Sequence, residues 1–240
     1  MLRVLILITT ISLGLIISSC SNNEPGLAEL KLEMKANTEL SSFNTGGRMA
    51  AEGLEFTEVL LGVTEIEFET DEEEDDEYGD DYDDLDDDGE DDSEEVEFEG
   101  EFIVDLIAGI STPDFGVADL APGLYDEFEI EMKPILPGNI TMFVAFNYTP
   151  DGATEPILYE YSTSAEMEFE IEKENGFLLE ETNINQILVL LELDALFADI
   201  DLSAATEDTD GVVRINAVSN ADLAAQIAQS FGEAFECGED

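Results

Sequence analysis

A pattern of carboxylates inside a strongly acidic stretch comes closest to a chemical motif in this sequence. The run from Asp84 to Gly89, with Glu95 six residues after the glycine, fits the calcium-loop pattern D-x-D-x-D-G-x5-E. Alternating oxygen donors and a glycine that turns the chain suit calcium. The candidate ligands are Asp84, Asp86, Asp88, Glu90 and Glu95. Calcium is the one cofactor that the sequence suggests.

The same pattern arises easily by chance, because 20 of the 27 residues from Asp71 to Glu97 are acidic. The eighth loop position, normally apolar in an EF-hand, is Asp91, and neither flank has the pattern of an amphipathic helix. A true EF-hand is thus the least favoured interpretation. Two alternatives remain open: weak, partly hydrated binding of divalent cations along the stretch, or a solvated charge run that keeps the surface soluble.

A second acidic group lies near the C-terminus and consists of Asp199, Asp201, Asp208 and Asp210. These side chains could line a metal site. Aspartate is also a common turn residue, and Gly211 follows directly. Turn formation is therefore the favoured explanation.

Tyrosines form the third candidate group. Tyr159 and Tyr161 share one face of an expected strand, and Tyr148 lies opposite them on the partner strand of a hairpin. Their rings could stack on a ligand. Covering the edge of the core is the commoner role of such a pair, and it is the favoured interpretation.

Composition excludes several classes of function. The chain has 240 residues, with 7 Lys and Arg against 61 Asp and Glu and no His, so its formal charge is −54. Nucleic-acid binding needs cations that displace phosphate counterions, so no nucleic-acid partner is expected. Without His there is no Ser-His or Cys-His dyad, and Cys237 sits among acids that disfavour a reactive thiolate. We expect no enzyme and no catalytic residue; a two-carboxylate glycosidase is the residual enzymatic alternative.

The first twenty residues have the layout of an export signal. Arg3 precedes an apolar stretch from Val4 to Ile17, which is shorter than the roughly 20 residues that a membrane-spanning helix needs. The ending Ile17-Ser18-Ser19-Cys20 resembles the lipobox of bacterial lipoproteins. This resemblance implies cleavage before Cys20, lipidation of Cys20 and a membrane partner bound through the lipid. Ser21 implies, by the same resemblance, sorting to the outer membrane, with the protein facing the periplasm or the surface.

The chain is expected to divide into a lipoprotein signal peptide (1–19), a lipidated tether (20–26) and a single domain (27–240). The acidic stretch 71–97 interrupts that domain and is expected to be a disordered loop, because its charges repel one another and it has little to bury. Glu65–Glu69 and Phe98–Leu106 are expected to pair as a hairpin around it.

Apolar and polar residues alternate in four segments, 28–36, 65–69, 127–133 and 166–172. Such alternation places one face of a strand in a core and the other in water, which is typical of antiparallel sheets. Ile187–Leu191 is apolar throughout and predicts a central strand buried on both faces. The expected fold is mainly β: an antiparallel β-sandwich with a short helix and a C-terminal amphipathic helix.

Turn and cap residues place the remaining elements. Pro150-Asp151-Gly152 predicts a hairpin between Ile140–Tyr148 and Ile157–Tyr161, and Asp210-Gly211 predicts another before Val212–Ile215. A short helix over Ala195–Ile200 is expected, capped by Asp194. The longer helix is expected to follow Ser219 or Asn220. Its apolar stripe is Leu223, Ile227, Phe231 and Phe235.

Several segments between Leu54 and Phe231 resemble a known lipoprotein family. They are Phe98–Leu106 and Leu120–Tyr125, together with Leu193–Leu202, Val212–Asn216 and Asn220–Phe231, which resemble the tails of acidic exported lipoproteins. The first two are similar to the "vDLL" strand and "pAGxY" turn of the β-sandwich called domain of unknown function 4382. That resemblance implies a sandwich fold and an exported, lipid-anchored location, and it brings no catalytic residue.

Three hypotheses for the function follow. The preferred one is a lipid-anchored cell-envelope protein whose sandwich is a non-enzymatic binding or structural module with a protein or glycan ligand not identified by the sequence. The second is a surface protein that binds divalent cations, calcium above all, through its acidic loop. The third is a carbohydrate-active enzyme.

Overall fold

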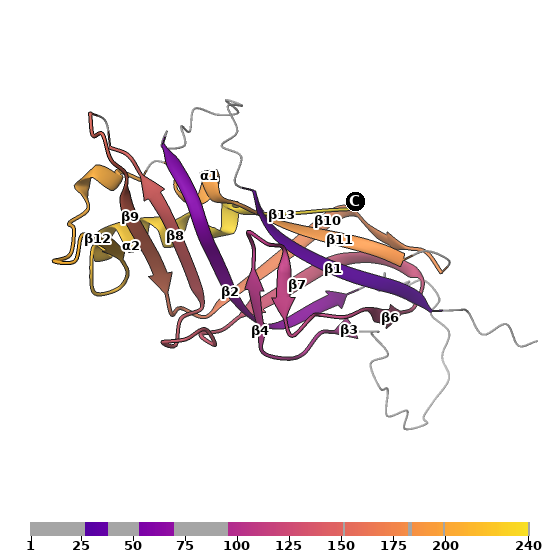
Figure 1. Cartoon of the computed structure of the whole chain (residues 1–240). Helices are drawn as coiled ribbons and strands as arrows, with labels where there is room; N and C mark the ends of the chain where they lie inside the picture. Colours follow the sequence, from indigo (N-terminus) through magenta and orange to yellow (C-terminus); the bar gives the residue numbers. More distant parts are fainter. Residues whose placement is uncertain are drawn as a thin grey trace, which may run out of the picture.

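The computed structural model describes residues 27–37, 53–69, 96–150, 152–181, 184–198 and 200–239. Within them the chain is mainly β, as predicted, and its strands form two sheets that pack against each other (Figure 1). No helix in these ranges is long and apolar enough to cross a membrane.

The smaller sheet has the strand order β13 (Phe235–Glu239), β11 (Ile184–Glu192), β1 (Ala28–Asn37) and β6 (Ala118–Leu120). The alternation predicted for β1 is confirmed by its burial. β11 is central, as expected, but only one of its faces is fully buried: Val189 and Leu191 are buried, whereas Leu188 and Leu190 are half-buried. The outward pair lies beside polar neighbours, since Leu188 is opposite Glu33 and Leu190 opposite Lys35.

The β1–β11 pair is parallel, which the alternation did not predict. Two strands far apart in the sequence can pair in either direction, and the alternation of apolar residues is the same in both. The sandwich is therefore antiparallel in most of its pairs but mixed in this sheet.

The larger sheet is organised by β2 (Leu54–Glu69), a strand of 16 residues. One edge of β2 pairs with β3 (Val96–Glu97) and β4 (Phe102–Asp105), and β5 (Ile110–Thr112) extends the sheet beyond β4. The chain on both sides of the acidic stretch thus pairs as a hairpin, as predicted, but Phe102–Asp105 pairs with Leu60–Val63 and not with Glu65–Glu69. β3 begins at Val96, inside the range expected to be disordered, and residues 70–95 lie outside the described part of the chain.

The other edge of β2 is shared by two strands that follow each other in the same direction. β7 (Gly123–Met132) pairs with Val63–Glu69, and β8 (Met142–Tyr148) pairs with Leu54–Leu61. The next two strands outward repeat this arrangement, because β9 (Ile157–Thr163) pairs with β8 and β10 (Met167–Leu179) pairs with β7. The larger sheet therefore has a break across it, at residues 133–141 between β7 and β8 and at residues 164–166 between β9 and β10.

Gly62 of β2 lies at this sheet break and contacts the residues on both sides of it. Its N–H donates to the Thr141 carbonyl oxygen at 2.8 Å, and its carbonyl accepts from the Lys133 N–H at 3.1 Å. A Cβ at this position would lie 2.6 Å from Ile135 Cγ1 and 2.7 Å from the Lys133 oxygen. Only glycine lets the 133–141 excursion approach β2 so closely.

The hairpin predicted at Pro150-Asp151-Gly152 is confirmed, because β8 and β9 pair in antiparallel register from Met142–Thr163 to Tyr148–Ile157. The second predicted hairpin is wrong. Asp208–Gly211 forms a tight turn, but β12 (Val212–Ile215) pairs in parallel with β9. The turn therefore leads into an edge strand and does not join two strands that pair with each other.

The two helices are present but are bounded differently from the prediction. α1 (Leu193–Leu196) continues directly from β11 with Glu192 as its N-cap, so Asp194 lies in its first turn and does not cap it. α2 (Ala221–Gln229) follows Asn220 and is shorter than expected. After it, Phe231–Glu233 forms a 3₁₀ turn and Phe235 begins β13, because pairing with β11 overrides the helical spacing.

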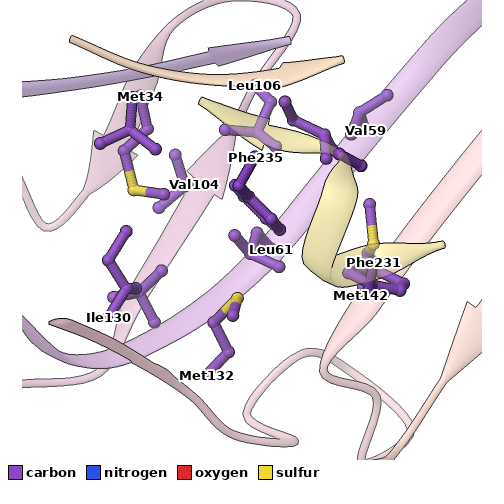
Figure 2. Close-up of a cluster of buried hydrophobic side chains, with 14 of the residues drawn as sticks. Met34, Val59, Leu61, Val104, Leu106, Ile130, Met132, Met142, Phe231 and Phe235 are labelled. Atoms are coloured by element: carbon purple, nitrogen blue, oxygen red, sulfur yellow. The ribbon is translucent and has the colours of Figure 1, made fainter. Parts of the chain in front are cut away.

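The core lies between the two sheets. Figure 2 shows Phe231 and Phe235, from the C-terminal segment, in a cluster with Met34 of β1 and Leu61 of β2. The C-terminal segment thus closes the side of the sandwich next to the sheet break.

Candidate functional site

Cys20 and the five candidate metal ligands Asp84, Asp86, Asp88, Glu90 and Glu95 lie outside the described residues. The structure therefore does not place the lipidation site or the calcium pattern. In the part of the chain that it does describe, no three His, Cys, Asp or Glu side chains are arranged to hold a metal ion.

The second acidic group serves the local fold. Arg214 of β12 contacts Glu160 at 3.1 Å and both Asp208 and Asp210 at 2.9 Å. Its hydrogen bonds lower the pKa of Asp210. Asp201 accepts from the Ser203 N–H at 3.1 Å and so caps a 3₁₀ turn over Leu202–Ala204. Asp199 lies outside the described residues, and the placed members of the group form turns and ion pairs.

A face of the larger sheet carries glutamates in register across three strands. Their apolar neighbours in β2 and β7, such as Ile66 and Phe128, are buried, so the glutamates are on the opposite, outer face. We call this set the glutamate face. Its rows are Glu65, Glu131 and Glu168; Glu67, Glu129 and Glu170; and Glu69 with Glu127.

Like charges directly opposite each other on a sheet are destabilising, because the Cβ atoms lie only about 5 Å apart. Glu129, in the middle of the glutamate face, shows this most clearly. Partial burial, then Glu168, Glu69 and other neighbouring carboxylates, raise the pKa of Glu129. At one corner of the glutamate face a lysine offsets the repulsion, since Lys133 Nζ lies 2.5 Å from Glu131 Oε2 and lowers the pKa of Glu131.

The tyrosines belong to the core, as the favoured interpretation held, but the two on β9 differ in one respect. Tyr159 is 3% exposed and its hydroxyl donates to the Leu202 carbonyl oxygen at 3.2 Å. Tyr161 is 1% exposed, and the Thr163 side chain lies beside its buried hydroxyl. Burial raises the pKa of Tyr161 to about 12, and the nearby Thr163 side chain opposes this only in part. The hydroxyl is therefore a protonated donor.

Two adjoining hollows meet at Tyr161 and run along α2. Both are lined by Tyr161, Thr163 and Ala165, where β9 gives way to β10 at the sheet break. The outer hollow has a volume of about 770 Å³ and lies between the 138–140 turn, the 216–219 loop and the first half of α2. The inner hollow has a volume of about 250 Å³ and lies under the end of α2. We call the two together the α2 groove.

The flank of α2 that faces the groove is made of small side chains. Leu223 and Ile227 are buried against the sheet. Ala221, Ala224 and Ala225 line the outer hollow and Ala228 lines the inner one, whereas Asp222 and Gln226 lie on the other flank. Because alanine projects so little, the space between α2 and the sheet break stays open.

This arrangement leaves room for a small molecule beside α2. Sequence reasoning named Tyr161 but did not find the groove, because its walls come from the sheet break and from α2, far apart in the chain. The glutamate face was also missed. Its glutamates belong to the alternating segments named in the sequence analysis. The sequence did not show which of these segments pair, and the pairing is what brings the carboxylates together.

Comparison with known proteins finds no matching family model, curated protein or solved structure.

Replacing Glu129 by Gln is expected to stabilise the fold at neutral pH by about 0.2–1 kcal/mol, or roughly one to three degrees in Tm. A carboxyl whose pKa is raised by folding opposes folding when it is ionised. The gain should therefore shrink as the pH falls toward the ordinary glutamate value of 4.5 and both forms become uncharged. Thermal unfolding at several pH values measures it.

Glu155→Gln is the matched control, because it removes the same charge from an exposed loop away from the glutamate face. A Glu129→Gln variant no more stable at pH 7 than this control would contradict the cost assigned to the like charges.

Proposed function

We propose that this protein is a lipid-anchored protein of the cell envelope and that its β-sandwich is a non-enzymatic binding module with the α2 groove as its site. The observation that supports the binding role is the α2 groove itself, whose two hollows of about 770 Å³ and 250 Å³ adjoin at Tyr161, Thr163 and Ala165. Sites for small molecules are typically concave and mostly apolar with a few polar groups, and the lining of this groove has that composition.

The anchoring role is supported by the sequence alone. An apolar stretch from Val4 to Ile17 precedes the Ile17-Ser18-Ser19-Cys20 ending, and a polar tether separates Cys20 from β1. A lipid on Cys20 would hold the sandwich close to a membrane surface, most consistently the outer membrane because Ser21 follows the cysteine. The strong negative charge would keep the sandwich itself off anionic lipids.

Divalent-cation binding is a second candidate function, and the glutamate face favours it. Its carboxylates lie close enough for burial and repulsion to raise the pKa of Glu129, so a divalent ion would relieve a real electrostatic cost. The acidic stretch 71–97 adds further carboxylates. We propose diffuse screening by calcium here, without an ordered site.

Cys20→Ala is expected to move the protein from the membrane fraction to the soluble fraction and to abolish incorporation of a labelled fatty acid. Cys237→Ala is the matched control, since it removes the other cysteine and should change neither. Fractionation with metabolic labelling decides this, and a Cys20→Ala protein that keeps its acyl label would overturn the anchoring role.

Ala225→Phe is expected to fill the outer hollow and to displace any small molecule that purifies with the protein. Gln226→Phe adds the same ring on the other flank of α2 and should leave the hollow open. Mass spectrometry of solvent extracts from the purified full-length proteins compares them. Identical extracts from wild type and both variants would count against a binding module at this groove.

Calcium is expected to bind weakly, with a dissociation constant of about 10⁻⁴–10⁻³ M, because no rigid cage orders the carboxylates. Asp86→Asn with Asp88→Asn should barely change it, since the charge is spread over many residues. Calorimetric titration at physiological salt is the measurement. A micromolar site lost in that double variant would establish the calcium-loop pattern instead, and no binding at millimolar calcium would remove this candidate.

A further inference from the structure

We propose that the end of the sandwich at which β1 begins rests on the membrane, where exposed apolar side chains touch the surface of a zwitterionic bilayer. We call this end, formed by residues 27–29, 119–124, 178–181 and 184–185, the tether end. The inference rests on the proposed lipid anchor at Cys20 and names the surface that the anchor brings to the bilayer. Three observations lead to it: the short tether, the strand ends gathered around it, and the apolar side chains that they expose.

The tether limits how far β1 can lie from a lipid on Cys20. Seven residues, 21–27, separate Cys20 from Ala28, the first residue of β1. Even a fully extended chain of this length spans at most about 30 Å. The larger sheet is longer than that, because the 16 residues of β2 extend over about 50 Å. A lipid on Cys20 therefore keeps the start of β1 near the bilayer, whereas the far end of the sandwich can lie well away from it.

Hydrogen bonds gather the ends of several strands around the start of β1. Ala28 pairs with Leu120, the last residue of β6. Asn185, near the start of β11, donates to the carbonyl oxygens of Glu29 and Glu180, at 3.2 Å each, and so ties β1 to the residue that follows β10. Figure 1 shows the start of β1 and β6 at one end of the molecule, with α2, β9 and β12 at the other.

Four large apolar side chains are exposed at the tether end. They are Leu27, Leu124, Leu178 and Ile184. Each is between 53% and 65% exposed, and the described residues contain only eight exposed side chains of this kind. Leu124 and Leu178 are directly opposite each other on β7 and β10, whereas Ile184 begins β11 and Leu27 precedes β1. Both sheets thus present apolar surface at the same end, where a flat lipid surface can touch it.

The charge of the tether end restricts the lipid that it can touch. Glu29, Asp119, Glu180 and Glu181 are exposed there, and β2 ends nearby at Glu69, where the acidic stretch begins. An anionic membrane surface repels these carboxylates. A zwitterionic surface does not, and a contact that reaches only the headgroup boundary leaves the carboxylates hydrated.

The tether also makes a weak contact sufficient. Linking the domain to the bilayer makes contact with the lipid an intramolecular event at a high effective concentration. The loss of translational freedom is then already met by the anchor and is not repeated for the contact. The apolar side chains therefore determine the orientation of the sandwich and not its affinity for the membrane. In that orientation the turn between β8 and β9 points away from the bilayer.

Quenching of a fluorescent probe by spin-labelled phospholipid tests the inference on the acylated protein, purified and reconstituted in phosphatidylcholine vesicles. Every protein carries Cys237→Ala, so that an environment-sensitive dye labels one introduced cysteine. Leu178→Cys places the dye at the tether end. Thr154→Cys places it at the exposed turn between β8 and β9, and Glu236→Cys places it at an exposed position of β13. We expect quenching at position 178 to be at least about threefold stronger than at either of the others.

Leu27→Gln with Ile184→Gln removes two of the four apolar side chains and leaves the dye at position 178. Quenching there is expected to fall about two- to fivefold. Ile110→Gln with Val218→Gln is the matched control, because it makes the same change at two exposed apolar side chains away from the tether end, and it should leave quenching unchanged. All four side chains are exposed, so we expect both variants to keep the Tm of the parent protein.

Replacing about a third of the phosphatidylcholine by phosphatidylglycerol is expected to reduce quenching at position 178, because the carboxylates of the tether end are repelled. Quenching that is equal or stronger on these anionic vesicles would overturn the choice of a zwitterionic surface.

Flotation of the same vesicles separates this inference from the anchoring role. Protein that does not float with the vesicles would overturn the lipid anchor and this inference with it. Protein that floats, but is quenched no more at position 178 than at 154 and 236, would leave the anchor standing and overturn the inference alone. Equal quenching in the parent protein and both double variants would also overturn it, because the apolar side chains would then make no contact.

Discussion

The hydrogen bonding of β2 is the constraint on which the larger sheet depends. This strand has partners along both edges, and at Gly62 it passes from pairing with β8 to pairing with β7. Because those two strands run in the same direction and cannot occupy the same stretch of β2, the chain between them must leave the sheet. The same interruption reappears between β9 and β10. The α2 groove follows from this interruption, since α2 lies beside the sheet break.

The charge distribution divides the molecule into regions with different roles. The glutamate face concentrates carboxylates on an outer surface, and the apolar residues that alternate with them in β2 and β7 supply the core that offsets their repulsion. Arg214 forms ion pairs with three acids of the β9–β12 corner and offsets part of their charge. The outer hollow has no charge in its described lining, although acids are abundant elsewhere in the chain.

Alternation of apolar residues was enough to predict the fold class and the strands β1, β2, β7 and β10, because burial on one face acts on each strand separately. It could not predict strand direction, so the parallel partners of β1 and β12 were missed. The helical spacing of Phe231 and Phe235 predicted a longer helix. Phe235 instead begins β13, which pairs with the edge of β11. The groove depends on contacts between distant segments, so the positions of Tyr161 and Thr163 in the sequence could not reveal it.

The parallel pairing of β1 with β11 has a consequence for the order in which the chain can fold. Asn37 of β1 donates a hydrogen bond to Glu192, 155 residues later in the sequence. A growing chain must therefore keep the apolar face of β1 without its β11 partner until Ile184–Glu192 has been made. Closing a contact of such high sequence separation is slow, and the waiting strand is exposed to aggregation. Lys31 and Lys35, placed among the glutamates of this early strand, give it the charged character that discourages edge-to-edge association in the meantime.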